Sequence, residues 1–266
     1  MIYVVPSLKA KEKLQSEGKV WAESQGFTYV LRHQRTIQDL MDEYGEDFLV
    51  YSSRGPQIDR PEGSHFFSLN MAELRIQNLR KGQRDHLLEA LIGRGASHQP
   101  LSVLDCTCGF GADAAVASFG LPAGSRVDAL EVSPLLEAVT SWGFSHFVHK
   151  KDDVTAALRR ISLRRGDYRD YLLSDEGPVY DVLYFDPMFQ RPVEASCQFQ
   201  PVRVIMEHGG LTRDLIERAL QKARRRVVIK ERDFRQLCRD FPEVTLCGGK
   251  YSRIGYAVLE CDSWKK

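Results

Sequence analysis

The hydrophobic positions between residues 100 and 240 fall into short apolar runs separated by longer amphipathic stretches. The short runs predict strands, and the longer stretches predict helices that follow them along the chain. The strand-like runs cover residues 101–105, 126–131, 180–185 and 226–230. Regular alternation of strands and helices predicts a mostly parallel, doubly wound sheet.

Two helix starts in this region carry clear signals, and the end of the chain follows a different pattern. Ser133 is a typical N-cap followed by Pro134, and Thr212 is expected to cap a helix over residues 213–223. Residues 244–247 and 253–260 have the pattern of two strands joined by a short glycine turn. We therefore expect an α/β fold whose mostly parallel sheet has an antiparallel C-terminal strand.

The first 69 residues alternate shorter strand-like and helix-like pieces. The expected strands cover residues 2–5, 27–31 and 48–51, and the expected helices cover 8–17 and 36–44. Thr36 and Asp39 have the spacing of a capping box, and the turn-rich residues 52–64 are expected to form a connector. Asn70 is expected to cap a helix that Gly82 breaks in two. These patterns predict a small N-terminal α/β unit over residues 1–69 and a main domain over 70–266.

Composition places the chain among ordinary water-soluble proteins. Hydrophobic residues make up 43% and charged residues 27% of the 266 positions, and no apolar run approaches the ~20 residues of a membrane span. The N-terminus lacks the basic and apolar regions of a signal peptide. The six cysteines form no C-x-x-C pair and no zinc-binding spacing, which predicts reduced thiols in the cytoplasm and no metal.

The net charge of +1 argues against a nucleic-acid binder that is strongly basic overall, but not against a local patch, and the basic residues are clustered. One cluster contains Arg159, Arg160, Arg164, Arg165 and Arg169, and the other contains Arg224, Arg225, Arg226, Lys230 and Arg232. Each cluster is open to two interpretations, a patch that contacts phosphates or a solvated helix face.

A glycine-rich turn follows the first strand of the main domain. Gly109 and Gly111 permit a sharp turn and a close approach of a ligand, and a helix beginning near Ala112 would point its N–H groups at that ligand. Glu131 ends the next strand, 26 residues after Asp105, where an acid can accept both hydroxyls of a ribose. These features predict a nucleotide-type cofactor, and the glycines also fit a dinucleotide fingerprint.

Two acidic residues favour an S-adenosylmethionine cofactor over a dinucleotide. Asp105, with Thr107 two residues on, would repel a pyrophosphate but suits the ammonium of a methionine group. Asp113 adds negative charge where a dinucleotide would place its phosphates. Asp167, between the runs at 126–131 and 180–185, sits where the third strand of such a sheet should end, and an acid there can hydrogen-bond an adenine amino group. The alternative roles are helix capping for Asp105 and Asp113 and a surface loop for Asp167.

A second motif follows the strand predicted over residues 180–185. Asp186, Pro187, Met188 and Phe189 resemble the Asp/Asn-Pro-Pro-Tyr/Phe signature of methyltransferases that modify amino groups conjugated to a ring. Asp186 and the Pro187 carbonyl can accept N–H bonds from such an amine, and Phe189 can stack on the base. A turn with a core phenylalanine is the alternative interpretation.

With these motifs in place, the chain resembles the bacterial class I methyltransferases related to the small-subunit ribosomal RNA guanine-N2 methyltransferase. The resemblance covers residues 100–240 and rests on Asp105-x-Thr107-x-Gly109-x-Gly111-x-Asp113-Ala114, Glu131-Val132-Ser133-Pro134, Asp186-Pro187-Met188-Phe189 and Arg226-Val227-Val228-Ile229-Lys230. It implies a Rossmann-like methyltransferase fold that binds S-adenosylmethionine. The residues it assigns to the cofactor are Ala112, Asp113, Glu131, Val132, the loop at Gly166-Asp167, and Asp186.

The sequence departs from that family's pattern in several places. The family usually has arginine where Ala112 and Val132 stand, and a lysine-rich stretch after the position of Phe189. The first hundred residues resemble a Gram-positive-type branch of homologues more than the ribosomal enzyme. The cofactor and the amine chemistry therefore carry over better than the identity of the nucleotide.

The leading hypothesis is an N-methyltransferase that acts on an exocyclic amine of ribosomal RNA, with guanine N2 as the expected atom. Asp186 would hold the amine, Phe189 would stack on the base, and Lys230 with the arginine clusters would contact phosphates. The alternatives are a methyltransferase of a protein or small amine, a nicotinamide-dependent oxidoreductase, and a non-catalytic RNA-binding module.

Overall fold

The computed structural model describes residues 1–93, 99–187, 210–248 and 254–264. The chain divides into two packing units, which are described separately. Among the described residues, the first unit contains Met1–Ser68 and Ser133–Phe147. The second contains the described parts of Leu69–Val132, Val148–Pro192 and Glu207–Lys266. The helix that starts at Pro134 packs with the N-terminal residues, so the packing units do not divide the chain at a single point. The division into two domains at residue 69 stays a prediction.

The first unit is built on a five-stranded sheet with the order β2-β1-β3-β4-β5. Its strands are β1 (Tyr3–Pro6), β2 (Thr28–Tyr29), β3 (Phe48–Ser52), β4 (Gly55–Arg60) and β5 (Gly63–Phe66). The first three are parallel, whereas β4 and β5 are antiparallel additions. The helices are α1 (Glu12–Ser24), α2 (Ile37–Tyr44) and α6 (Pro134–His146).

The capping box, connector and first helix predicted in the first unit agree with the structure to different degrees. The capping box of Thr36 and Asp39 is confirmed, with both reciprocal bonds present at the start of α2. The expected connector over 52–64 is wrong, because this segment forms β4 and the start of β5. Its glycines mark tight turns between strands: Gly55 has a φ of 87° and lies against the ring of Trp142. The helix expected over 8–17 begins at Glu12 and continues to Ser24.

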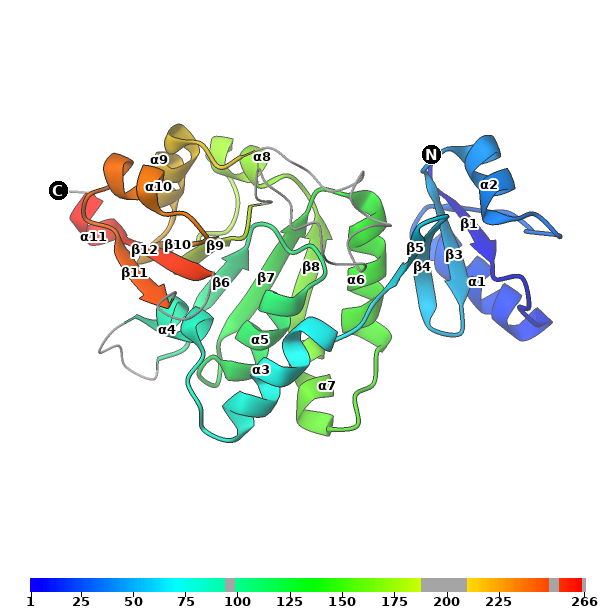
Figure 1. Cartoon of the computed structure of the whole chain (residues 1–266), viewed down its shortest axis with the longest axis horizontal. Helices are drawn as coiled ribbons and strands as arrows, with labels where there is room; N and C mark the ends of the chain where they lie inside the picture. The colour runs from blue at the N-terminus through cyan, green and yellow to red at the C-terminus, as the bar shows by residue number, and fades with distance from the viewer. Residues whose placement is uncertain (94–98, 188–209, 249–253, 265–266) are drawn as a thin grey trace. The chain divides into compact units, whose positions relative to one another are not determined.

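The second unit contains a seven-stranded sheet with the order β11-β12-β10-β9-β6-β7-β8 (Figure 1). Its strands are β6 (Ser102–Asp105), β7 (Arg126–Glu131), β8 (Ile161–Arg165), β9 (Val182–Phe185), β10 (Arg226–Glu231), β11 (Thr245–Gly248) and β12 (Gly255–Glu260). β12 runs antiparallel to both of its neighbours, and the other pairs are parallel. The predicted fold class is confirmed: a mostly parallel, Rossmann-like sheet with an antiparallel C-terminal strand.

Helices cover both faces of this sheet, as Figure 1 shows. On one face α5 (Ala112–Gly120) contacts α3 (Asn70–Arg80), α4 (His86–Ile92) and α7 (Asp152–Arg159). On the other, α9 (Arg213–Lys222) contacts α8 (Tyr168–Leu173) and α11 (Cys261–Trp264), and α10 (Arg235–Asp240) lies near them. No helix among the described residues is both long and apolar enough to cross a membrane.

The core beneath α8 and α9 is apolar and fixes the strands that carry the site. Leu104, Leu183 and Ile229 on neighbouring strands pack with Ile216 and Leu220 of α9, and each is at most 4% exposed. Because β6 pairs in parallel with β7 and β9, and β9 pairs in parallel with β10, their carboxyl ends meet at one edge. Ligands of open α/β sheets bind at this edge.

Two details of the first helices in this unit bear on that edge. Gly82, with a φ of 74°, lies between the end of α3 and the start of α4, so the predicted break is confirmed. Asn70 is the first helical residue of α3 rather than its cap, because Leu69 occupies the cap position without a side-chain bond. The cap of α4 is Asp85, whose carboxylate accepts the N–H groups of Leu87 and Leu88.

Candidate active site

The glycine-rich turn after β6 has the conformation that its residues predicted. Gly109 and Gly111 both have positive φ values, 53° and 76°, and α5 begins at Ala112. The carboxylate of Asp105 accepts the N–H of Thr107 at 3.1 Å, which closes the turn at the strand end. The backbone here therefore needs glycine at two points and leads directly into a helix N-terminus.

Glu131 joins the end of β7 to this turn. Its Oε2 accepts the N–H of Gly109 at 2.8 Å, and the residue is 7% exposed. A carboxylate oxygen has capacity for further bonds, so a ribose acid at this position is compatible with the contact. Val132 follows Glu131 directly, and the Gly166 N–H donates to the Glu131 carbonyl at 3.0 Å. The ends of β6, β7 and β8 are thus tied together.

Asp167 lies two residues beyond β8 and caps α8. Its carboxylate accepts the backbone N–H of Arg169 at 2.8 Å and pairs with the Arg169 guanidinium at 2.9 Å. The expected location at the end of the third strand is confirmed by the sheet order. Contact of Asp167 with an adenine amino group stays a prediction.

Asp186 follows β9 and is fixed from two directions. Its backbone N–H donates to Thr107 Oγ1 at 2.7 Å, and its Oδ2 accepts a bond from Lys230 Nζ at 2.7 Å. Pro187 is the last described residue of this segment. Phe189, predicted to stack on the base, lies outside the described residues, as does Met188.

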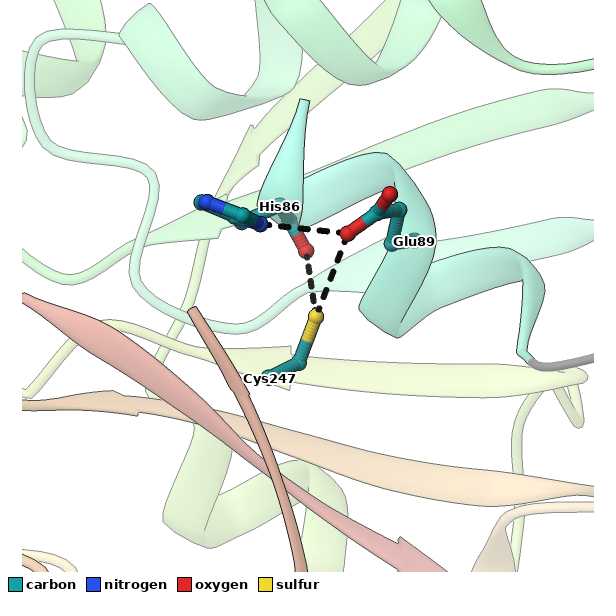
Figure 2. A group of neighbouring side chains, drawn as sticks. All are labelled: His86, Glu89 and Cys247. Atoms are coloured by element: carbon teal, nitrogen blue, oxygen red, sulfur yellow. Dashed lines mark hydrogen bonds and ion pairs between the residues drawn. The ribbon is translucent and has the colours of Figure 1, made fainter. Parts of the chain in front are cut away.

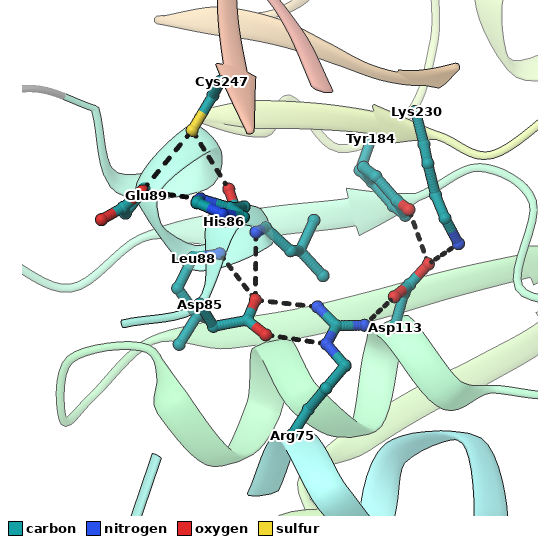
Figure 3. A network of polar contacts seen from close by, with 10 residues as sticks. Arg75, Asp85, His86, Leu88, Glu89, Asp113, Tyr184, Lys230 and Cys247 are labelled. Atoms are coloured by element: carbon teal, nitrogen blue, oxygen red, sulfur yellow. Dashed lines mark hydrogen bonds and ion pairs between the residues drawn. The ribbon is translucent and has the colours of Figure 1, made fainter. Parts of the chain in front are cut away.

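A buried charge network underlies Asp186. Lys230 Nζ lies between two carboxylates, 2.7 Å from Asp186 Oδ2 and 2.8 Å from Asp113 Oδ2. Asp113 also accepts the Tyr184 hydroxyl at 2.7 Å and pairs through its other oxygen with Arg75 (Figure 3). The side chain of Lys230 is 15% exposed, so its ammonium is engaged within the site, not presented to phosphates as the sequence suggested.

Arg75 extends this network away from the strand ends. Its guanidinium donates to both carboxylate oxygens of Asp85, at 2.7 and 2.8 Å, and a third nitrogen pairs with Asp113 (Figure 3). Such a fork-shaped contact fixes two carboxylates in one plane. Arg75 and Tyr184 were missed by sequence reasoning, because they lie 38 and 71 residues from Asp113.

Burial and neighbouring charges shift the pKa values of the three carboxyls at this edge differently. Burial raises the pKa of Asp186 to about 6, and the charge of Asp113 adds to this rise while Lys230 opposes it. Burial likewise raises the pKa of Asp105 well above its ordinary value. Burial also opposes ionisation of Asp113, but Lys230 and Arg75 outweigh it and lower the pKa of that carboxyl. With a pKa of about 6, Asp186 therefore titrates just below neutral pH.

Lys230 stays protonated throughout this range. Burial alone would lower the pKa of its ammonium, but the charges of Asp113 and Asp186 raise it above its ordinary value. The ammonium acts as a fixed cation that the two carboxylates share.

The residues fit S-adenosylmethionine better than a dinucleotide. The helix N-terminus at Ala112 suits the cofactor's carboxylate, Asp105 suits its ammonium, and Glu131 suits its ribose. A pyrophosphate would instead meet Asp105 and Asp113 at the same turn, and the nearby Lys230 is already paired. The donor set thus matches a cofactor with a cationic head and a nucleoside.

Comparisons with known proteins agree with this chemistry. A protein called YpiP in Bacillus subtilis is 28% identical over 229 residues, covering 86% of this chain and 88% of that protein. The "Ribosomal RNA small subunit methyltransferase J" of Thioalkalivibrio sulfidiphilus is 32% identical, covering 59% of this chain. The match spans 61% of that protein's length. The same-named protein of Dechloromonas aromatica is 28% identical, with 72% and 76% covered.

A solved structure shares the fold of this chain, and a family model matches its sequence. A crystal structure of a methyltransferase from Neisseria gonorrhoeae superposes with a TM-score of 0.64 at 18% identity, over 97% of this chain and 95% of that one, which shows a shared fold. The family described as "Putative SAM-dependent methyltransferase" matches residues 63–254. This match decides between the methyltransferase and the nicotinamide-dependent oxidoreductase. The chain belongs to the S-adenosylmethionine-dependent methyltransferases.

Proposed function

We propose that this methyltransferase modifies an exocyclic amine of a base in ribosomal RNA, with guanine N2 as the acceptor atom. The observation that carries the proposal is the position of Asp186. Asp186 directly follows β9 and precedes Pro187, and its backbone N–H is tied to the cofactor turn through Thr107 Oγ1. A carboxylate and a proline carbonyl are the acceptors that a planar amine requires.

The acceptor groups answer a specific chemical problem. The nitrogen lone pair of an exocyclic amine is delocalised into the ring, so the amine is a weak nucleophile. Asp186 and the Pro187 carbonyl would each accept one N–H and so point the lone pair at the incoming methyl carbon. S-adenosylmethionine, when bound, supplies a methyl group on a sulfonium. The amine would take up this methyl group with loss of the sulfonium bond to it, and Asp186 would lie beside the nitrogen that then gives up a proton.

Asp186 also suits the proton step. A carboxyl with a pKa of about 6 is ionised at neutral pH and can still take up a proton as the nitrogen is methylated. Lys230 would hold the carboxylate in place during the step, because its ammonium is fixed by Asp113 on the opposite side. Lys230 and Asp113 are therefore proposed as positioning residues.

The same geometry supports a proposed set of cofactor-binding residues. We assign the amino-acid end of the cofactor to the turn and helix start, and the nucleoside end to the next two strand ends. The proposed residues are Asp105, Thr107, Gly109, Gly111, Ala112, Asp113, Glu131, Val132, Asp167 and Asp186. The carboxylate of Asp113 is engaged by Lys230, Tyr184 and Arg75, so its proposed role is to organise the site. Its backbone belongs to the first turn of α5, the helix start assigned to the cofactor.

Ribosomal RNA is proposed from the relatives and from the charge near the site. Two of the relatives named above carry a ribosomal RNA methyltransferase name. Arg164 and Arg165 are exposed at the carboxyl end of β8, the edge at which Asp186 lies. We propose that they contact phosphates beside a base that has left its helix. A ribosomal substrate would place the reaction in the cytoplasm.

The test is transfer of a radiolabelled methyl group to small-subunit RNA from cells that lack this protein. Asp186→Asn should abolish transfer while changing cofactor affinity only modestly, and the exposed Asp214→Asn serves as a matched carboxylate control. Label that appears in N2-methylguanosine and disappears after ribonuclease treatment supports the proposal. Label that survives removal of RNA would assign the enzyme to a protein or small amine instead.

A further inference from the structure

A separate cluster of metal-ligating side chains lies outside the methyl-transfer site. His86 and Glu89 stand on the first turn of α4, and Cys247 comes from β11 (Figure 2). His86 Nδ1 lies 3.1 Å from Glu89 Oε2, and Cys247 Sγ lies 3.7 Å from that same oxygen. All three candidate ligand atoms fall within 4.8 Å of one another.

We propose that these three side chains bind a zinc ion, with water in the fourth position. Bond lengths of about 2.0–2.3 Å in a tetrahedron place neighbouring ligand atoms roughly 3.3–3.6 Å apart. The distances from Glu89 Oε2 to His86 Nδ1 and to Cys247 Sγ bracket that range, and all three atoms lie within 4.8 Å of one another. Side-chain rotations would bring the three atoms to one ion. One nitrogen, one thiolate and one carboxylate form a donor set typical of zinc rather than of magnesium or calcium.

The backbone around the cluster is built for close approach. Gly248 follows Cys247 with a φ of 78°, and a Cβ there would stand 3.1 Å from the His86 ring. Glycine therefore allows the end of β11 to meet the imidazole. The three residues also line one cavity of about 780 Å³, which leaves room for a metal-bound water.

The surrounding charges direct Glu89 toward the ion. Arg84 NH1 pairs with Glu89 Oε1 at 3.7 Å, while Oε2 is the oxygen that faces His86 and Cys247. The side chain of His86 is 58% exposed, so its ring has space to turn toward a ligand. No spacing rule could reveal this set, because Cys247 lies 158 residues from Glu89, and the sequence had predicted no metal.

A bound ion would cross-link α4 to β11 and so restrain the charge network that begins at Asp85. Asp85, the residue before His86, caps α4 and holds Arg75, which in turn pairs with Asp113 (Figure 3). The cross-link joins two segments far apart in the chain, so zinc should raise the melting temperature of the folded protein.

The test uses the full-length protein, reduced and freed of metal with a chelator, without RNA or cofactor. Zinc titrated against a chromophoric competitor should bind with a stoichiometry of one. The cobalt-substituted protein should show a thiolate-to-metal charge-transfer band. Cys247→Ser should remove that band and weaken zinc binding by more than about 100-fold, the upper end for mutating mere supporting residues. The exposed Cys238→Ser is the matched control and should retain both properties.

Glu89→Gln and His86→Ala provide independent variants should Cys247→Ser fold poorly, as judged by circular dichroism. Each should weaken zinc binding and remove the zinc-dependent rise in melting temperature. Absence of zinc binding by the wild-type protein, or equal binding by all three variants, would overturn the proposal. Because these measurements need no methyl transfer, their outcome is independent of the proposed substrate.

Discussion

The backbone N–H of Asp186 donates a hydrogen bond to Thr107 Oγ1 at 2.7 Å. The bond joins the end of β9, which carries the proposed amine acceptor, to the turn after β6, which carries the proposed cofactor site. The two halves of the reaction are therefore held in register by one hydroxyl. Small displacements between reacting groups are costly to rate, so this contact should matter to turnover.

Thr107→Val tests this link because it keeps the shape of the side chain and removes the hydroxyl. An unmade buried hydrogen bond costs about 1–3 kcal/mol, and we expect kcat to fall by about tenfold or more. Thr107→Ser retains the hydroxyl and should recover most of the loss. Steady-state kinetics with both variants would check this, and equal rates for valine and serine would refute the link.

Lys230 should be needed both for stability and for the ionisation of Asp186. Lys230→Met leaves the buried Asp113 carboxylate and the partly buried Asp186 carboxylate without their shared cation. Breaking a fully buried pair costs about 3–5 kcal/mol, and we expect a loss at the lower end of that range. The pKa of Asp186 should rise further, because Lys230 is the charge that offsets the rise caused by burial. Denaturant unfolding would measure the first effect and the pH dependence of residual activity the second. Lys230→Arg keeps the charge and should be milder on both counts.

The pH dependence of the wild-type enzyme follows from Asp186. Its amine-accepting form is the carboxylate, so kcat/KM should fall with unit slope as the pH drops below about 6. The free energy of unfolding should respond in the opposite direction. A carboxyl whose pKa is raised by folding binds its proton more tightly in the native state, so its contribution to stability declines as pH rises from about 4 to 6.

Activity and stability measured over the same pH range would separate this carboxyl from others. An acid limb in kcat/KM centred near pH 4, the value of an unperturbed carboxyl, would show that Asp186 is not the group that titrates. The Asp214→Asn control should leave the acid limb in place, since that residue is exposed on α9.

Arg75 offers a test of the network at a distance from the reacting groups. Arg75→Met removes the cation that Asp85 and Asp113 share, and we expect a loss of about 3 kcal/mol in unfolding free energy. Arg75→Lys keeps the charge without the fork and should recover only part of it. The cofactor's dissociation constant should change less than kcat in both variants. If Arg75 bound the cofactor directly, calorimetric titration would show a larger change in the dissociation constant than in kcat.

Glu131→Ala should weaken cofactor binding selectively. The substitution removes both the expected ribose acceptor and the bond to the Gly109 N–H. We expect the affinity for S-adenosylhomocysteine to fall at least about tenfold, the scale of one charged hydrogen bond. RNA affinity measured by filter binding should be unchanged, and a parallel loss of both would indicate a folding defect.

Much of the second unit was predictable because its strands are short, apolar and bounded by clear signals. The runs that became β9 and β10 contain continuous hydrophobic segments, as expected for strands buried on both faces. The strands β6 and β7 also carry polar residues, but their apolar residues are buried. β4 was missed because its residues include few large apolar side chains. Asp59 and Arg60 are buried in it instead, and Arg60 donates to the carbonyls of Asp59 and Glu46.

The candidate site was predictable where chemistry follows a strand end. Asp105, Glu131 and Asp186 each end or follow a parallel strand, so one edge had to bring them together. The partners of Asp113 could not be predicted in the same way. Arg75 comes from α3 and Tyr184 from the middle of a buried strand, and only tertiary packing places them beside that carboxylate.

The central claim, that Asp186 presents a base amine to the cofactor, is tested most directly by analysing the nucleosides of small-subunit ribosomal RNA. Cells lacking this protein would be complemented with the wild type, Asp186→Asn or Asp214→Asn, and the digested RNA examined by mass spectrometry. We predict one N2-methylguanosine that disappears on deletion, returns with wild type and Asp214→Asn, and stays absent with Asp186→Asn. Unchanged methylation in the deletion strain, or full recovery with Asp186→Asn, would contradict the account.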